Sequence, residues 1–598
     1  MKRLLQAATG IVALTALAIV LLPYIVSTEA AKAQITEALS DWLDTSVVVA
    51  GEPSMRFVPT LELTLPEVTI GGDDDDLRIK AQTIKAELNL IPLIVGHFDI
   101  AEFRLNAPQI SVSRQYIAER LADRTTVGSL LERLSVHDFS IDKATVALTS
   151  DGLDPAIYNQ FDLQLTWPSQ ESELSLRGGL IVSGELVEFR ANFSNPLIIS
   201  NPGQSTVSAF LANSLFQIRF EGTATGGKFG PKVLGALEFG TSSVRRLAGW
   251  LGFNLGEGAA MGPFALNGEA EITEKTVLLP KVSVEIDGNA AEGALSIERD
   301  QIWSISGSLA AEKLDISPYT EEIFSAFADG TVQSLAADIL TPESANIDMQ
   351  ISADQVLIGD IRLGRTSCSF LLQDGSMALE VGESLLYGGS MSLSAGTKPL
   401  PGSVGIQLSA RIKDVRLGNF NWFDSTLKIA SGTVNSATLA LTSSGASFVE
   451  LFAGLKGDVK AEGTDLTLEG VGVSARVDSF NDEQPAPSAA DEEAMRSRFS
   501  TFTFDGAMAD KMLVVKSITA DSELLDITAR GSISLASEQV GLEGTATIKK
   551  DQQALLSVPV KIRGPYKNPR LRPISAPDTP QRVPPDDTVE EESTPQVQ

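Results

Sequence analysis

The chain has 598 residues, a formal net charge of −30 and a single cysteine, Cys368. The negative charge disfavours nucleic acid as a partner, because binding to phosphates needs cationic patches. One cysteine excludes an intrachain disulfide, and two histidines, His97 and His137, leave little scope for zinc sites or histidine-based acid–base chemistry. The sequence also lacks the common catalytic and metal-binding motifs, so we expect no enzyme, no cofactor and no metal.

The N-terminus predicts a membrane anchor. Lys2 and Arg3 precede 23 uncharged residues, Leu4 to Val26, which as a helix would extend about 34 Å and cross a hydrocarbon core of about 30 Å. Because cations stay on the cytoplasmic side, we expect the rest of the chain outside the cytoplasm. A cleaved signal peptide ending at Ala33 is the alternative, although the apolar run is longer than a signal core.

Apolar and polar residues alternate along most of the body, as they do from Val404 to Ile412. This alternation places one face of each strand in an apolar environment and the other face in water, and it is typical of antiparallel sheets. We therefore predict a mainly β protein with few helices. A filled β-sandwich core and an open apolar groove produce the same alternation, so the period alone does not distinguish them.

Asp-Gly pairs are expected to form hairpin turns between the strands. These pairs lie at residues 151–152, 287–288, 329–330, 374–375 and 505–506. A second pattern, in which glycine precedes alternating small and apolar residues, is expected where a strand leaves a turn. It begins at Gly293, Gly389, Gly531 and Gly544.

Short helical stripes are expected to cap the ends of the sheet. They lie at residues 30–43, 114–134, 244–251, 318–327 and 447–455. Two segments are too acidic and proline-rich to join a core and are predicted to be disordered: a loop at residues 478–498 and a tail at residues 574–598.

Several segments, taken in chain order, carry a resemblance to a known family. In the N-terminal part they are Leu21-Leu22-Pro23, Phe57-Val58-Pro59, Leu63-Thr64-Leu65-Pro66 and Phe103-Arg104-Leu105-Asn106. In the C-terminal half they are Leu385-Leu386-Tyr387-Gly388-Gly389, Gly445-Ala446-Ser447, Leu455-Lys456-Gly457 and Pro559-Val560-Lys561-Ile562-Arg563-Gly564. In their order and spacing these segments resemble the AsmA family of Gram-negative envelope proteins. Residues 150–280 match that family only loosely.

The resemblance implies a periplasmic β-rich body held by one inner-membrane helix. The AsmA family is similar to chorein-type bridge proteins, in which a long sheet curls into an open groove lined by apolar side chains. The implied role is phospholipid movement toward the outer membrane and maintenance of the envelope, without catalytic residues. The expected lipid-lining residues are Phe161, Leu163, Leu165, Val282, Val284, Ile286, Ile347, Met349, Ile351, Ile406, Leu408, Ile412, Val558, Val560 and Ile562.

The expected organisation runs from the anchor to the tail. It comprises a cytoplasmic stub and anchor (1–28), an AsmA- or chorein-like region (29–150), a central β-groove (151–477), the acidic loop (478–498), a C-terminal AsmA-like β region (499–573) and the tail (574–598). Phospholipid and the inner membrane are the expected partners. The alternative function is a scaffold for the assembly of outer-membrane proteins, which would bind envelope partners through sheet edges.

Overall fold

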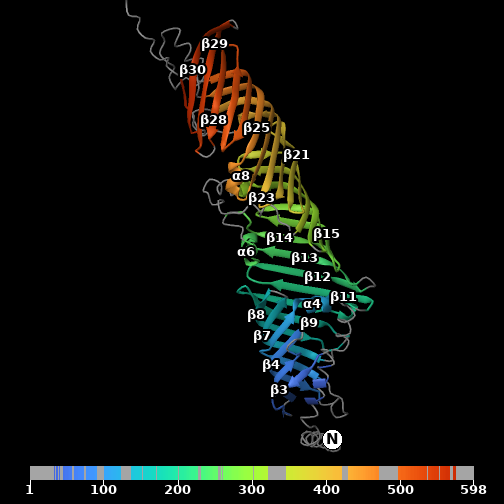
Figure 1. Ribbon diagram of the computed structural model, residues 1–598. Helices are drawn as coiled ribbons and strands as arrows, with labels where there is room; N and C mark the ends of the chain where they lie inside the picture. Colours follow the sequence, from blue (N-terminus) through green and yellow to red (C-terminus); the bar gives the residue numbers. More distant parts are fainter. Residues whose placement is uncertain are drawn as a thin grey trace, which may run out of the picture. The chain divides into compact units, whose positions relative to one another are not determined.

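The computed structural model describes most of the β-rich body (Figure 1). The described residues are 32–33, 36–37, 40, 45–56, 60–72, 76–89, 100–122, 136–150, 153–169, 171–199, 201–226, 230–253, 258, 260–300, 302–320, 345–419, 428–469, 496–534, 537–550, 553–565 and 570–573. The expected anchor (1–28), most of the acidic loop (478–498) and the tail (574–598) lie outside them. Within these ranges, no helix is both long and apolar enough to cross a membrane.

The chain divides into two compact units. Unit 1 consists of Met1–Ser325, Glu343–Leu357 and Phe370–Gln373, and unit 2 consists of Ala326–Pro342, Ile358–Ser369 and Asp374–Gln598. Strands dominate both units, which confirms the mainly β fold.

Unit 1 contains the first eighteen strands of the described chain, up to Leu357 of the last one. They are β1 (Val47–Val49), β2 (Ser54–Arg56), β3 (Leu61–Ile70), β4 (Leu77–Leu88), β5 (Ile100–Asn106), β6 (Gln109–Ser113), β7 (Val136–Ser150), β8 (Leu153–Thr166), β9 (Leu174–Val182), β10 (Glu185–Phe193), β11 (Gly203–Ala212), β12 (Phe216–Gly226), β13 (Lys232–Thr241), β14 (Phe264–Ile272), β15 (Thr276–Ile286), β16 (Asn289–Arg299), β17 (Trp303–Asp315) and β18 (Ala345–Ile358). Figure 1 shows β11 to β15 as successive neighbours in one ladder.

Unit 2 holds the remaining strands, apart from β20 (Thr366–Gln373), whose last four residues belong to unit 1. They are β19 (Ile361–Leu363), β21 (Ser376–Leu386), β22 (Gly389–Leu400), β23 (Ser403–Arg416), β24 (Lys428–Gly445), β25 (Lys456–Glu469), β26 (Arg496–Ala509), β27 (Met512–Asp521), β28 (Leu525–Ser534), β29 (Gln539–Lys550), β30 (Gln553–Pro565) and β31 (Arg570–Pro573).

Both units are built mainly by the addition of hairpins. Each strand from β8 to β16 in unit 1, and from β21 to β30 in unit 2, pairs antiparallel with the next strand along the chain. This order agrees with the antiparallel sheet that the alternation predicts, because hairpin-connected strands each bury one face.

The expectation of a purely antiparallel sheet is wrong at three pairings in unit 1. Strands β5 and β6, which together form one strand interrupted at Ala107 and Pro108, both pair parallel with β7, and β17 pairs parallel with β18. A parallel neighbour needs a long return connection. The connections before β7 and β18 are long enough for this, and the first carries α4 (Arg114–Ala122).

The Asp-Gly turns have mixed outcomes. Asp287-Gly288 and Asp374-Gly375 form the expected turns, with positive φ at all four residues. The prediction is wrong for Asp505-Gly506, which lies inside β26 at a register shift. The turn that follows β26 is formed by Asp510 and Lys511. The pairs at 151–152 and 329–330 lie outside the described residues.

Short helices occur where the stripes predict them. They are α4, α6 (Val244–Trp250) and α8 (Phe448–Ala453), with 3₁₀ turns η1 (Pro196–Ile199) and η4 (Leu417–Asn419) that were not expected. Residues 317–320, and the described residues between 32 and 40, are also helical.

Candidate functional site

The expected lining residues of unit 1 lie on one face of the sheet. The pairing of the strands shows this, because directly opposed residues in neighbouring strands share a face. The row of opposed residues from Leu165 in β8 to Ile351 in β18 passes through Leu176, Ala191, Ala209, Phe220, Leu237, Gly268, Val282, Gly293 and Leu309. We call this surface the apolar face of unit 1. Phe161, Leu163, Val284, Ile286, Ile347 and Met349 share it by alternation.

Unit 2 has an equivalent apolar face. Its row of opposed residues from Ala410 in β23 to Ile562 in β30 passes through Leu439, Val459, Gly506, Val515, Gly531 and Leu542. Ile406, Leu408 and Ile412 share this face in β23, and Val558 and Val560 share it in β30. The expected lining residues are therefore brought together within each unit, although they are far apart in the sequence.

Burial is uneven along these faces. At the N-terminal strands β3 and β4, Leu63, Ile84 and Ala86 are completely buried, as in a filled core. Among the fifteen expected lining residues only Val282 and Val560 are buried, and the other thirteen are partly exposed. The expected lining residues are therefore mostly in partial contact with solvent, while the side chains at the N-terminal end of unit 1 are buried.

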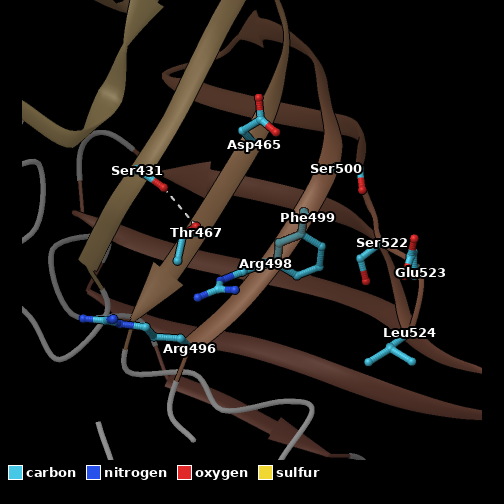
Figure 2. Close-up of a pocket in the computed structure, with 10 residues that line it drawn as sticks. All are labelled: Ser431, Asp465, Thr467, Arg496, Arg498, Phe499, Ser500, Ser522, Glu523 and Leu524. Carbon is cyan, nitrogen blue, oxygen red and sulfur yellow. Dashed lines mark hydrogen bonds between the residues drawn. The ribbon is translucent and has the colours of Figure 1, made fainter. Parts of the chain in front are cut away.

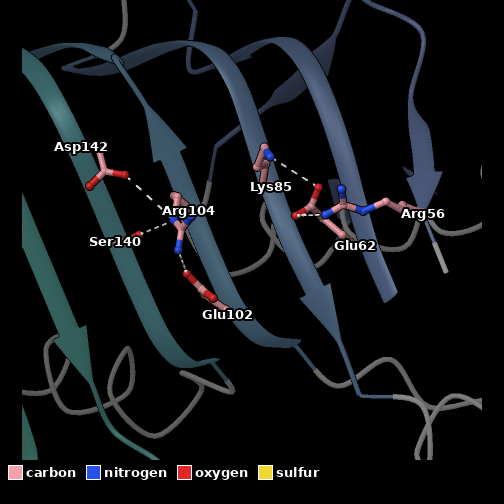
Figure 3. A network of polar contacts seen from close by, with 7 residues as sticks. All are labelled: Arg56, Glu62, Lys85, Glu102, Arg104, Ser140 and Asp142. Carbon is pink, nitrogen blue, oxygen red and sulfur yellow. Dashed lines mark hydrogen bonds and ion pairs between the residues drawn. The ribbon is translucent and has the colours of Figure 1, made fainter. Parts of the chain in front are cut away.

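The opposite face is polar and carries ladders of charge. In unit 1, Glu62 lies 3.4 Å from both Arg56 and Lys85, and Arg104 pairs with Glu102 and Asp142 (Figure 3). Such exposed ion pairs contribute little to stability, so we assign them to solubility and to strand register.

A similar ladder crosses three strands of unit 2. Lys516 of β27 donates a hydrogen bond to Asp458 of β25 across 3.0 Å and lies 3.7 Å from Asp505 of β26. The hydrogen bond and charge of Lys516 lower the pKa of the Asp458 carboxyl, and the hydrogen bond to Asp458 raises the pKa of Lys516. Both groups therefore stay charged near neutral pH, which keeps this face polar.

Glycines lie in the middle of many strands, on the apolar faces. We call nine of them the central glycines: Gly178, Gly222, Gly235, Gly293, Gly307, Gly457, Gly463, Gly531 and Gly544. A Cβ atom added at any of them would lie within 2.4 Å of a carbonyl oxygen of a neighbouring strand. Glycine inside a strand marks a bend or a close approach of backbones, and such kinks curve a sheet.

The central glycines correct the interpretation of the recurring glycine pattern. Gly389 begins β22 after a turn, as expected, but Gly293, Gly531 and Gly544 are strand-interior residues. The sequence signal that could have found them is their place in the alternation, because each occupies an apolar-face position two residues before an aliphatic or alanine side chain.

Two short helices cover the ends of the apolar faces. In unit 2, α8 packs its buried Leu451 against Val404 and Ile406 of β23. In unit 1, the ring of Trp250 in α6 lies 5.8 Å from that of Phe216, and its Nε1 donates to the carbonyl of Val182 across 3.0 Å. These contacts agree with the expected capping role.

Comparison with models of protein families and with curated proteins found no match for this chain. The resemblance to the AsmA family therefore rests on the quoted segments.

Proposed function

We propose that this is an inner-membrane-anchored periplasmic protein of outer-membrane biogenesis that binds or conducts phospholipid along its apolar faces. The observation that carries the proposal is the partial exposure of thirteen expected lining residues within rows of apolar side chains and glycines that cross each unit from strand to strand. Contiguous apolar surface that stays partly exposed usually marks an interaction site.

An acyl chain suits these faces better than a polar ligand does. Each CH₂ group that leaves water gains about 0.8 kcal/mol, without any need for hydrogen bonds from the protein. The apolar side chains of neighbouring strands offer such contact repeatedly along each row. The head group of the lipid would stay in water at the open edge.

The curled, open form of the groove is part of the proposal. The central glycines support it, because strand bends on the apolar side favour a concave face. The polar, net-negative exterior also supports it, since like charges keep the body off anionic bilayers and leave the apolar face as the place where lipid would bind.

The test uses Leu408, a partly exposed residue in the middle of β23 that lies opposite Ala395 and Leu441. In an open groove, the carboxylate of Leu408→Asp can reach water, so the melting temperature should fall by only a few degrees. Bound phospholipid, measured by mass spectrometry of the purified protein, should fall by at least about fivefold, because the charge opposes the acyl chain.

Gln407→Asp is the matched control, since Gln407 is the next residue of β23 and is exposed on the polar face. It should preserve both folding and lipid content. A closed core would bury the new carboxylate of Leu408→Asp at a cost of several kcal/mol and unfold the region. That result, or full lipid content in a folded Leu408→Asp protein, would contradict the proposal.

A further inference from the structure

Unit 2 contains a polar hollow of about 710 Å³ beside its apolar face (Figure 2). The hollow lies at Asp465 of β25 and Ser500 of β26, between the pairs Thr464–Thr501 and Leu466–Phe499, which keep one continuous register. Its size falls within the range of small-ligand sites. Its lining residues are Ser431, Asp465, Thr467, Arg496, Arg498, Phe499, Ser500, Ser522, Glu523 and Leu524.

Charged side chains of both signs line this hollow, and only one of the four is paired within the described part of the chain. Arg496 is paired with Glu469, its Nη2 lying 2.7 Å from the carboxylate. By contrast, the side chains of Arg498, Asp465 and Glu523 make no hydrogen bond or ion pair with any described residue. Figure 2 shows Arg498 between Thr467 and Phe499, with Asp465 beyond Thr467 and Glu523 across the hollow.

Two hollows on unit 1 show the usual arrangement. One has a volume of about 450 Å³ and is lined by Glu238, which pairs with Arg219. The other has a volume of about 320 Å³, and its Arg177 donates to Gln164. The hollow of unit 2 differs, because the exposed side chains of Arg498, Asp465 and Glu523 around it have no partner among the described residues and are free to meet a ligand that carries both signs.

Apolar surface adjoins these charges. Phe499 lines the hollow but is only 2% exposed, because it packs into the hydrophobic cluster that contains the expected lining residue Val560, so the accessible apolar surface comes from its neighbour in the hollow. Leu524, also at the hollow, is 64% exposed. A ligand with a charged end and an apolar end could therefore place each against matching surface.

We propose that this hollow binds the head group of a zwitterionic aminophospholipid. The planar guanidinium of Arg498 receives the phosphate, for which its paired N–H donors are suited. Asp465 and Glu523 receive the ammonium group, and the acyl chains begin against the exposed side chain of Leu524. An anionic lipid such as phosphatidylglycerol has no ammonium group to meet the two carboxylates, which oppose its uncompensated negative charge, so the hollow selects against it. This inference rests on the proposed lipid-binding function and names its substrate class.

The test measures binding of three acyl-labelled lipids with identical chains to the full-length protein. They are phosphatidylethanolamine, phosphatidylglycerol and diacylglycerol, each supplied in vesicles of otherwise equal composition. The natural chain should bind phosphatidylethanolamine at least about fivefold more than either of the others. Arg498→Gln should reduce phosphatidylethanolamine binding to the diacylglycerol level, because the phosphate loses its charged donor. The double variant Asp465→Asn and Glu523→Gln should bind phosphatidylglycerol as well as phosphatidylethanolamine.

Arg411→Gln is the matched control. Arg411 is exposed on the polar face of β23, opposite Ser392 and Thr438 and outside the hollow, so its removal should leave the preference unchanged. An undiminished preference in Arg498→Gln would overturn the inference, while continued binding of labelled lipid would leave the proposed function standing.

Two other results separate the alternatives. Free phosphoethanolamine that binds as tightly as the lipid would show a site for a soluble compound and would overturn the lipid assignment. Failure of the natural chain to bind any of the three lipids would instead overturn the proposed function itself.

Discussion

At the scale of single residues, glycine decides how the strands can bend on their apolar side. The central glycines occupy positions where alternation would otherwise place an aliphatic side chain, and the neighbouring backbone already fills the space of a Cβ. Their role is steric, because a side chain there would push two paired strands apart.

Gly293→Ala tests this role. The added Cβ would lie 1.9 Å from the carbonyl oxygen of Ser308 in the next strand, so we expect the free energy of unfolding to fall by about 2–3 kcal/mol. Urea denaturation of the purified protein measures the change.

Gly249→Ala is the comparison variant. Gly249 lies in α6, and a Cβ there would have no neighbouring atom within 4 Å. Alanine favours helices over glycine, so this variant should be as stable as the natural chain, or more stable by about 0.5–1 kcal/mol. Equal stability of both variants would show that the strands do not need glycine at residue 293.

At the scale of elements, hairpins and short helices perform different tasks. The hairpins extend each sheet, and the helices cover the ends of the apolar faces. Helix α8 is fixed at its start by Ser447, whose hydroxyl accepts a hydrogen bond from the backbone N–H of Glu450, and it is held on the sheet by Leu451. A helix of six residues does not hold its shape alone, so packing must supply most of its stability.

Leu451→Ala should release α8 from the sheet. Leu451 is 3% exposed against Val404 and Ile406, and its truncation should cost about 2–4 kcal/mol of the free energy of unfolding of unit 2. Val449, in the same helix, is 38% exposed, so Val449→Ala should cost less than about 0.5 kcal/mol. Denaturant unfolding followed by circular dichroism measures both values, and equal costs would contradict the capping role of Leu451.

At the scale of the whole molecule, the proposed function requires the body to lie in the periplasm. Lys2 and Arg3 before the uncharged run carry this expectation. A C-terminal reporter that is active only in the periplasm should therefore be active, and the protein should remain with inner membranes after a high-salt wash.

Exchanging the flanking charges provides the control for this topology. Replacement of Lys2 and Arg3 by Glu should lower reporter activity, because the cations that hold the N-terminus in the cytoplasm are lost. A shortened soluble form of the natural chain would support cleavage near Ala33, and an inactive reporter would contradict the periplasmic location.

The sequence by itself determined that the fold is rich in strands and which residues of each strand belong to its apolar face. Alternation is a local property, because successive side chains in a strand point to opposite sides whatever the partner strand is. Residues such as Leu165, Leu408 and Ile562 could therefore be assigned to an apolar surface before any pairing was known. Short helices such as α6 and α8 were also predictable, since their stripes are local.

Only the tertiary structure decided how these local faces combine. Register between strands depends on bulges and on long connections, and neither is visible in alternation. This is why Asp505-Gly506 lies within a strand rather than in a turn, and why β17 pairs parallel with β18. The hollow around Arg498 was not predictable for the same reason, because its lining residues come from three strands and a turn that pairing brings together. The exposure of the apolar faces likewise depends on packing, and the alternation of residues in the sequence does not predict it.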